Sequence, residues 1–267
     1  MVSMSSMEKK NEIADFSDYW SSSGIQSGDT ILIHSSMRRT YRELSKRGLS
    51  LGSGTIIDSL LKILGSKGTL ILPLFNFDFP TSKFFSMPET PSQMGRVTED
   101  ARLMYSGIRT GHPMYSFYVI GHHQQVFSGL ENKSGYGEDS PFAKLLELDG
   151  KIGVVDLEDQ DSMTIYHHVE EKLGIPYRYH KEFSGIYVDS KGQSSQKTFS
   201  VFVRNIEKGV ITDVNKMGEI LWQEGIYTGA RPGVGNGLRV GKAREIFLRT
   251  SQEIEAGRAL GTLYSIR

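Results

Sequence analysis

The chain has 267 residues and an apolar fraction of 38%, which is enough for one large α/β domain with a sizeable buried core. Its 31 basic and 31 acidic residues balance and no basic block stands out, so we expect a small-molecule partner rather than nucleic acid or a membrane surface. The absence of cysteine excludes disulfides, thiolate zinc sites and a cysteine-bound covalent intermediate. No apolar run approaches the roughly 20 residues that span a bilayer, and residues 1–12 lack the apolar middle of a signal peptide, so we expect a cytoplasmic protein.

In the first part of the chain, apolar runs alternate with amphipathic segments, which predicts strands alternating with helices. The predicted strands are 30–37, 68–75, 117–121 and 151–156, and the predicted helices are 8–23, 55–64, 96–106 and 141–148. A glycine-rich loop at 49–54 precedes the second helix, and its glycine spacing fits neither a P-loop nor a dinucleotide motif. The aromatic loop at 76–95 is too long for a mere connection, and long loops beside strand ends usually line sites.

After Pro176 the pattern changes to short alternating strands. A hairpin is predicted over 183–203 with its turn at 189–193, followed by a helix at 214–224, a glycine-rich turn at 229–237 and a last helix at 240–251. We favour a simple hairpin turn over a phosphate loop for GVGNG, because no strand is predicted before it. The predicted fold is a three-layer α/β/α architecture with a mixed central sheet and a small β-rich C-terminal addition. We expect a main catalytic region at 1–180 and a smaller part at 181–267, packed together as one continuous domain.

Residues 156–178 contain two adjacent histidines and two adjacent glutamates on a predicted amphipathic helix. Residues three apart share a helix face, so His167 neighbours Glu170 and His168 neighbours Glu171, and the two pairs point in different directions. A carboxylate beside an imidazole fixes its tautomer and raises its basicity, which describes an oriented general base. Spacing alone does not show which of the two pairs is the general base. A polar helix surface with weak ion pairs would explain both pairs without any catalytic role.

The predicted strand at 30–37 ends in polar residues, and the carboxyl ends of strands are where open α/β sheets place ligands. They are His34, Ser35 and Ser36, and Arg38, Arg39 and Arg42 come directly after them, either to bind phosphate or as a solvated basic turn. His122 and His123 are adjacent but lack a nearby carboxylate, so no metal site is predicted.

Taken together, several segments resemble the antibiotic (aminoglycoside) N-acetyltransferases, a family that transfers an acyl group from coenzyme A to an amine. They occur in the family's order between about residues 28 and 177. The matching pieces are Gly28-Asp29-Thr30 through His34-Ser35-Ser36, Gly68-Thr69-Leu70 through Pro73 with Phe75, Arg109 with His112-Pro113 and Ser116, Ser140-Pro141 with Leu148-Asp149-Gly150-Lys151, and Thr164-x-x-His167-x-x-Glu170.

The resemblance implies an acyl-CoA-dependent N-acyltransferase in which His167 is the general base and Glu170 its partner. It thereby selects one of the two pairs, and leaves His168 with Glu171 as the solvated pair. Thr164, Ser35 and Ser36 are candidate donors to the oxygen that becomes negative during transfer. The expected coenzyme A contacts are His34, Ser35, Ser36, Arg38, Arg109 and Ser116; the expected substrate contacts are Phe75, Asp78 and Tyr115; no metal is expected.

We expect a small-molecule amine as the substrate, and the sequence leaves open whether the protein forms a homodimer. Many aminoglycoside-modifying members have histidine where this chain has Tyr115, and the neutral net charge differs from the acidic pockets that suit a polycationic drug. We therefore favour a nucleotide-linked or glycan-precursor amino sugar, with aminoglycoside 3-N-acetylation as the alternative. A non-catalytic binding protein on the same fold is a second alternative. A metal hydrolase fits less well, because HHVEE is not His-Glu-x-x-His.

Overall fold

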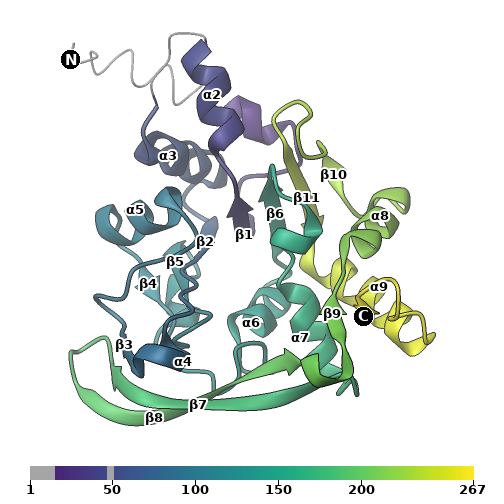
Figure 1. The fold of residues 1–267 in the computed structure, drawn as a ribbon. Helices are drawn as coiled ribbons and strands as arrows, with labels where there is room; N and C mark the ends of the chain where they lie inside the picture. The colour runs from purple at the N-terminus through teal and green to yellow at the C-terminus, as the bar shows by residue number, and fades with distance from the viewer. Residues whose placement is uncertain (1–15, 47–50) are drawn as a thin grey trace.

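The structure is a computed structural model that describes residues 16–46 and 51–267. Within these residues a seven-stranded mixed sheet has the order β10-β11-β6-β1-β2-β5-β4 (Figure 1). Strands β6, β1 and β2 are parallel, whereas β5 and β11 join their outer sides in antiparallel orientation. The carboxyl ends of the three parallel strands therefore share one edge of the sheet. The strands are β1 (Thr30–Ser35), β2 (Thr69–Pro73), β4 (Ile108–Arg109), β5 (Phe117–Gly121), β6 (Lys151–Val155), β10 (Thr228–Gly229) and β11 (Leu238–Lys242).

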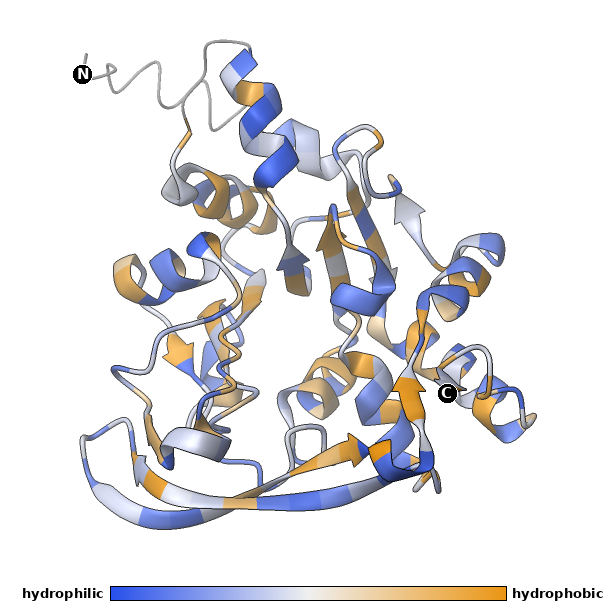
Figure 2. Cartoon of the chain, in the orientation of Figure 1, coloured by the Kyte–Doolittle hydropathy of each residue, from blue (hydrophilic) through white to orange (hydrophobic). Residues whose placement is uncertain are grey.

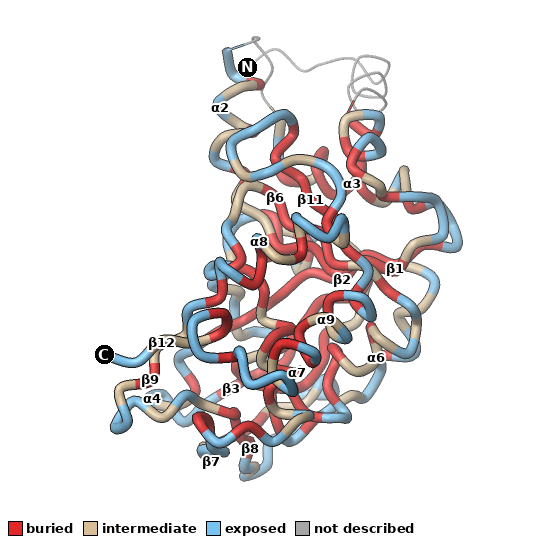
Figure 3. The backbone as a smooth tube through the Cα atoms, turned by 90° about the vertical axis from the view of Figure 1, so that its right-hand side faces the viewer, coloured by how far each residue is buried: buried red, intermediate tan, exposed pale blue. Residues whose placement is uncertain are grey.

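Helices cover both faces of this sheet, because its strands are apolar on both sides. Along β1, Ile31 and Ile33 belong to one hydrophobic cluster and Leu32 to the other. The first cluster includes helical residues 16–21, α3 (Ser53–Leu64) and α5 (Arg96–Met104). The second includes α6 (Pro141–Glu147), α7 (Ile165–Lys172) and α9 (Ala243–Glu255). The buried tube segments of Figure 3 and the apolar strands of Figure 2 follow this layering.

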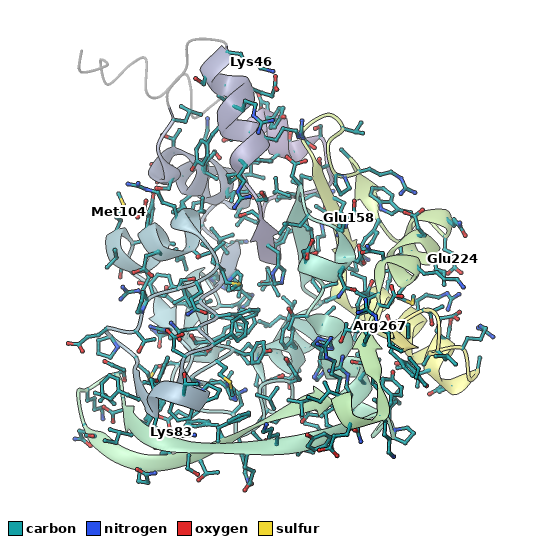
Figure 4. The ribbon with its side chains drawn as sticks, in the orientation of Figure 1. Lys46, Lys83, Met104, Glu158, Glu224 and Arg267 are labelled. Atoms are coloured by element: carbon teal, nitrogen blue, oxygen red, sulfur yellow. The ribbon has the colours of Figure 1, made fainter. Side chains whose placement is uncertain are left out.

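A second sheet lies below the first in Figure 1, with the order β3-β7-β8. Its long antiparallel hairpin consists of β7 (Arg178–Val188) and β8 (Ser194–Arg204), and β3 (Phe84–Ser86) pairs with the far end of β7. Because β7 begins soon after α7 and ends against the 76–95 loop, the hairpin spans the gap between these two parts of the molecule. Side chains fill the space between the hairpin and the central sheet (Figure 4).

Short elements complete the chain between these larger ones. The remaining helices are α2 (Arg38–Lys46), α4 (Phe79–Ser82) and α8 (Asn215–Gln223), with 3-10 turns η1 (Gln124–Phe127), η2 (Asp159–Asp161) and η3 (Ile206–Lys208). Strands β9 (Val210–Thr212) and β12 (Tyr264–Ile266) form a separate pair. No helix in the described ranges is both long and apolar enough to cross a membrane.

The three-layer α/β fold with a mixed sheet, predicted from the sequence, is confirmed. The turn at GVGNG is also confirmed, because it joins the antiparallel strands β10 and β11. Gly237 has φ +67°, and a Cβ there would lie 2.1 Å from Asp156 Oδ1, which explains the glycine at this turn.

The prediction of a helix beginning at residue 240 is wrong. Residues 238–242 form β11, and the helix begins at Ala243. Leu238 and Val240 are buried where β11 pairs with β6, so long-range pairing overrides the local helical pattern. Similarly, Arg38, Arg39 and Arg42 lie on α2 rather than in a turn, and the 76–95 loop contains α4 and β3.

Two predicted segments fall partly outside the described residues, namely the start of the helix at 8–23 and part of the loop at 49–54. The boundary near residue 180 stays a prediction. Because β10 and β11 complete the central sheet, the C-terminal part contributes to the main architecture as well as to the hairpin.

Candidate active site

The helix α7 places His167 and Glu170 on one face, as the i,i+3 spacing requires. His167 Nδ1 lies 2.8 Å from Glu170 Oε2. The Glu170 side chain is only 1% exposed, while that of His167 is 19% exposed. A buried carboxylate accepts the Nδ1–H, which leaves Nε2 with a lone pair to accept a proton.

Glu170 is held from the other side by residues at the start of β7. Tyr177 OH donates to Glu170 Oε1 at 3.0 Å, and Arg178 Nε forms an ion pair with Glu170 Oε2 at 2.7 Å. The chain after α7 thus fixes the carboxylate that orients the histidine. Tyr136 adds an aromatic wall, with its ring centroid 5.1 Å from that of His167.

The pKa of His167 lies below its usual value. Burial is the largest cause and the charge of Arg178 the second, while the hydrogen bond and charge of Glu170 act in the opposite direction. His167 is therefore unprotonated at neutral pH, which is the state that a general base needs.

Two cavities meet at His167. We call the first, about 220 Å³, the acidic cavity, because Asp159 and Asp161 line it and no lysine or arginine does among the described residues. The residues of η2 line it, and Glu158, which Figure 4 labels, directly precedes η2 in the chain. Its wall also includes His34, Phe75, Tyr115, Thr164 and His167.

The second cavity, about 340 Å³, lies between α7 and the β7–β8 hairpin, and we call it the basic cavity. Arg178, Lys181 and Arg204 line it, and its described lining contains no aspartate or glutamate. His167, Tyr115 and Thr212 line both cavities. The histidine therefore stands between two spaces of opposite charge.

The carboxylates of the acidic cavity differ in what they contact. Asp159 is buried and accepts hydrogen bonds from Tyr166 OH, Tyr227 OH and Arg239 Nη2 at 2.6, 2.7 and 2.7 Å. Asp161 is exposed and has no ion-pair partner among residues 16–46 and 51–267. Asp161 is thus the carboxylate available to a cation in this cavity.

A model of the aminoglycoside 3-N-acetyltransferase family matches residues 32–255. The chain belongs to this family. The aminoglycoside N(3')-acetyltransferase-like protein YokD, derived from the SPbeta prophage of Bacillus subtilis, is 26% identical over 179 residues, or 58% of this chain and 62% of YokD. The match spans about three fifths of the length of the curated relatives.

Solved structures share the fold at lower identity. AAC-IIIb in a binary complex with CoASH has a TM-score of 0.75 at 20% identity, covering 92% of this chain and 96% of that one. AAC-VIa bound to sisomicin has a TM-score of 0.73 at 20% identity, covering 94% and 98%. These comparisons confirm the family resemblance and the fold class predicted from the sequence.

In this member of the family, several expected site residues come together in the acidic cavity. His34, Phe75, Tyr115, Thr164 and His167 all line it. Burial, with a smaller contribution from the charge of Arg239, lowers the pKa of His34 to about 4, so its imidazole is neutral at pH 7. Ser35 and Ser36 lie at and just after the end of β1 without lining this cavity. The individual roles of these residues stay predictions.

Other expected contacts lie elsewhere. Arg109 is buried on β4, where Nε donates to Ser116 Oγ at 3.1 Å and Nη1 donates to the backbone oxygens of Met87 and Thr90. Arg109 thus joins the 76–95 loop to the sheet edge, while Ser116 Oγ donates to the backbone oxygen of Leu74, and neither residue lines the two cavities at His167. Arg38 and Asp78 are exposed. Their expected part in binding coenzyme A or substrate stays a prediction.

The expectation of a solvated His168–Glu171 pair is wrong. His168 is 3% exposed, its Nδ1 lies 2.6 Å from the backbone oxygen of Tyr136, and its ring packs between Phe142 and Phe247. Glu171 instead accepts a hydrogen bond from Ser134 Oγ. His168 is buried because α6 and α9 pack around α7, and the spacing of residues along α7 does not predict this packing.

Sequence reasoning missed Tyr177, Arg178, Asp161 and the whole basic cavity. Tyr177 and Arg178 lie at the end of the 156–178 stretch, but no local pattern pairs them with Glu170. The cavity combines β7, β8 and β9 with α7, so no single segment signals it. In the described ranges no three His, Cys, Asp or Glu side chains are grouped to hold a metal ion.

Proposed function

We propose that this protein is an acyl-CoA-dependent N-acyltransferase that acetylates an amine of an aminoglycoside-type amino sugar, with His167 as the general base. One observation carries the proposal: the His167–Glu170 pair stands between a cavity lined by carboxylates and a cavity lined by cations. The family membership supports the reaction class, and the relatives' names support the substrate class.

The acidic cavity suits the acceptor amine. Amines of amino sugars are mostly protonated at neutral pH, and Asp161 attracts such a cation while neutral His34 does not repel it. The bound amine must lose a proton before it can attack. His167 Nε2 accepts that proton, and Glu170 stabilises the imidazolium that results.

The basic cavity suits the acyl donor, whose phosphates are anionic. Lys181 and Arg204 have no ion-pair partner within the described residues, so their charges are available to a ligand. When bound, acyl-CoA supplies the acyl group as an activated thioester. The neighbour solved with CoASH supports coenzyme A as the co-substrate.

The preference for a nucleotide-linked amino sugar is not supported, and the comparisons favour the aminoglycoside alternative. The net charge of the whole chain is a sum over the entire surface and does not give the charge of one cavity. A neutral chain can still present carboxylates in one cavity and cations in another, as this one does.

The proposal is tested by measuring thiol release from acetyl-CoA with purified protein and a panel of aminoglycosides, with mass spectrometry of the product. We expect turnover with at least one aminoglycoside and a roughly hundred- to ten-thousand-fold lower kcat for His167→Ala. His122→Ala is the matched control, because it removes an exposed histidine that lines neither cavity at His167. Turnover confined to a nucleotide-linked amino sugar would reject the substrate, and no thiol release with any amine would reject the enzyme.

Charge reversal tests the assignment of the two cavities. Asp161→Lys should raise KM for the aminoglycoside and leave KM for acetyl-CoA nearly unchanged, whereas Lys181→Glu should do the opposite. Because both positions are exposed, each effect should be a few-fold and should shrink at high salt. The reverse pattern would exchange the two ligands between the cavities.

A further inference from the structure

The carboxylate of Glu170 serves two partners through the same oxygen. His167 Nδ1 lies 2.8 Å from Oε2, and Arg178 Nε lies 2.7 Å from it. The Arg178 contact is an ion pair without hydrogen-bond geometry, so its effect is electrostatic. The other oxygen, Oε1, accepts from Tyr177 OH.

Arg178 is held rigidly where it makes this contact. Its side chain is 5% exposed, Nη2 donates to Thr212 Oγ1 at 3.0 Å, and Nη1 donates to the backbone oxygen of Phe202 at 3.3 Å. It is the first residue of β7 and pairs in register with Arg204 of β8. The guanidinium is therefore fixed by β8 and β9 as well as by its own strand.

We propose that Arg178 is a positioning residue that pins Glu170 against His167 and, by sharing its carboxylate, keeps the histidine unprotonated between catalytic cycles. An aspartate or glutamate devoted to a histidine alone favours the imidazolium strongly. A fixed cation on the same oxygen offsets part of this attraction. The carboxylate then still orients the ring and still steadies the imidazolium during proton transfer.

The surroundings of His167 agree with this balance. Burial lowers its pKa first and Arg178 second, with Arg204 adding a smaller contribution in the same direction, while Glu170 raises it. The other charged or titratable groups beside it or its cavities are Tyr115, Tyr136, Tyr177, Lys181, Asp159, Asp161 and His34. Among these residues Arg178 has the only direct contact with the Glu170 oxygen that His167 uses.

The experiment measures the titration of His167 by NMR, assigned by the signal that His167→Gln removes, in the full-length protein. Arg178→Met should raise the His167 pKa by roughly one unit or more, because the opposing cation is lost. Arg178→Lys should restore most of this shift, since the charge returns. Arg204→Gln is the matched control, because it removes a nearby charge that does not touch Glu170, and its shift should be clearly smaller.

Kinetics supply the second readout, and this part rests on the proposed function. The acid limb of the kcat/KM profile should move to higher pH in Arg178→Met, in parallel with the NMR titration. Its kcat at the plateau should fall about ten-fold or more. Arg178→Lys should restore the position of the acid limb, because the charge returns, but should restore the plateau kcat less fully, because lysine lacks the planar guanidinium that reaches Thr212.

A folded Arg178→Met protein with an unchanged His167 titration would overturn the inference, and a purely structural role predicts that result. If Arg178→Met does not fold, Thr212→Val carries the test: it loosens the guanidinium and should raise the His167 pKa by a smaller amount, and no change would overturn the inference. An altered titration in a protein that acylates no amine would instead reject the proposed function and leave the role of Arg178 intact.

Discussion

Asp159 offers the sharpest test of how the candidate site is held together. Its two oxygens accept hydrogen bonds from Tyr166, Tyr227 and Arg239, and the Arg239 side chain is 1% exposed. Asp159→Ala leaves the guanidinium buried without its carboxylate and removes the acceptor of two buried hydroxyls. The variant should therefore unfold far more easily than the wild type.

The magnitude follows from the geometry. Removing one partner of a buried ion pair costs about 3–5 kcal/mol, and an unsatisfied buried hydroxyl costs about 1–3 kcal/mol. Tyr166 OH and Tyr227 OH lie 3.4 Å apart and can bond to each other, so part of the second cost is recovered. We expect a loss of about 4 kcal/mol, a large share of the roughly 5–15 kcal/mol that stabilises a typical domain.

Urea unfolding followed by circular dichroism measures this loss. Asp161→Ala, two residues away and exposed, is the matched control and should change the free energy of unfolding by less than about 0.5 kcal/mol. Arg239→Met in the Asp159→Ala background should restore part of the stability, because it removes the unpaired charge. Equal unfolding midpoints for the Asp159 and Asp161 variants would refute the reasoning.

Three further predictions concern burial around the site. Gly218→Ala should lower the free energy of unfolding by more than about 1 kcal/mol, because the added Cβ would lie 2.5 Å from Asp159 Cγ. Gly54→Ala is the control and should be tolerated, because the atom nearest to its added Cβ is 3.5 Å away. The midpoints of urea unfolding of the two variants are compared with that of the wild type. Burial lowers the pKa of His112 to about 4, so folding stability should fall as pH drops from about 6.5 to 4, by up to about 3 kcal/mol, and His112→Gln should flatten this dependence in acid unfolding curves. His168→Ala should lower the thermal midpoint without moving the acid limb of the pH–activity profile, and a shifted limb would contradict its structural role.

Much of the fold was readable from local sequence. The apolar runs that form β1, β2, β5 and β6 stand out because strands buried on both faces need uninterrupted apolar residues. By contrast, β11 has Arg239 at its second position, and its strand state depends on pairing with β6, about ninety residues earlier. No window of the sequence contains both strands, so the local pattern favoured a helix.

The same division separates the parts of the candidate site. The sequence by itself determined that His167 and Glu170 meet, because residues three apart on a helix are neighbours wherever that helix lies. Only the tertiary structure decided that His168 is buried, that Arg178 shares Glu170, and that opposite charges line the two cavities. Burial and electrostatic environment depend on which distant segments fold against α7, and those contacts have no fixed spacing along the chain.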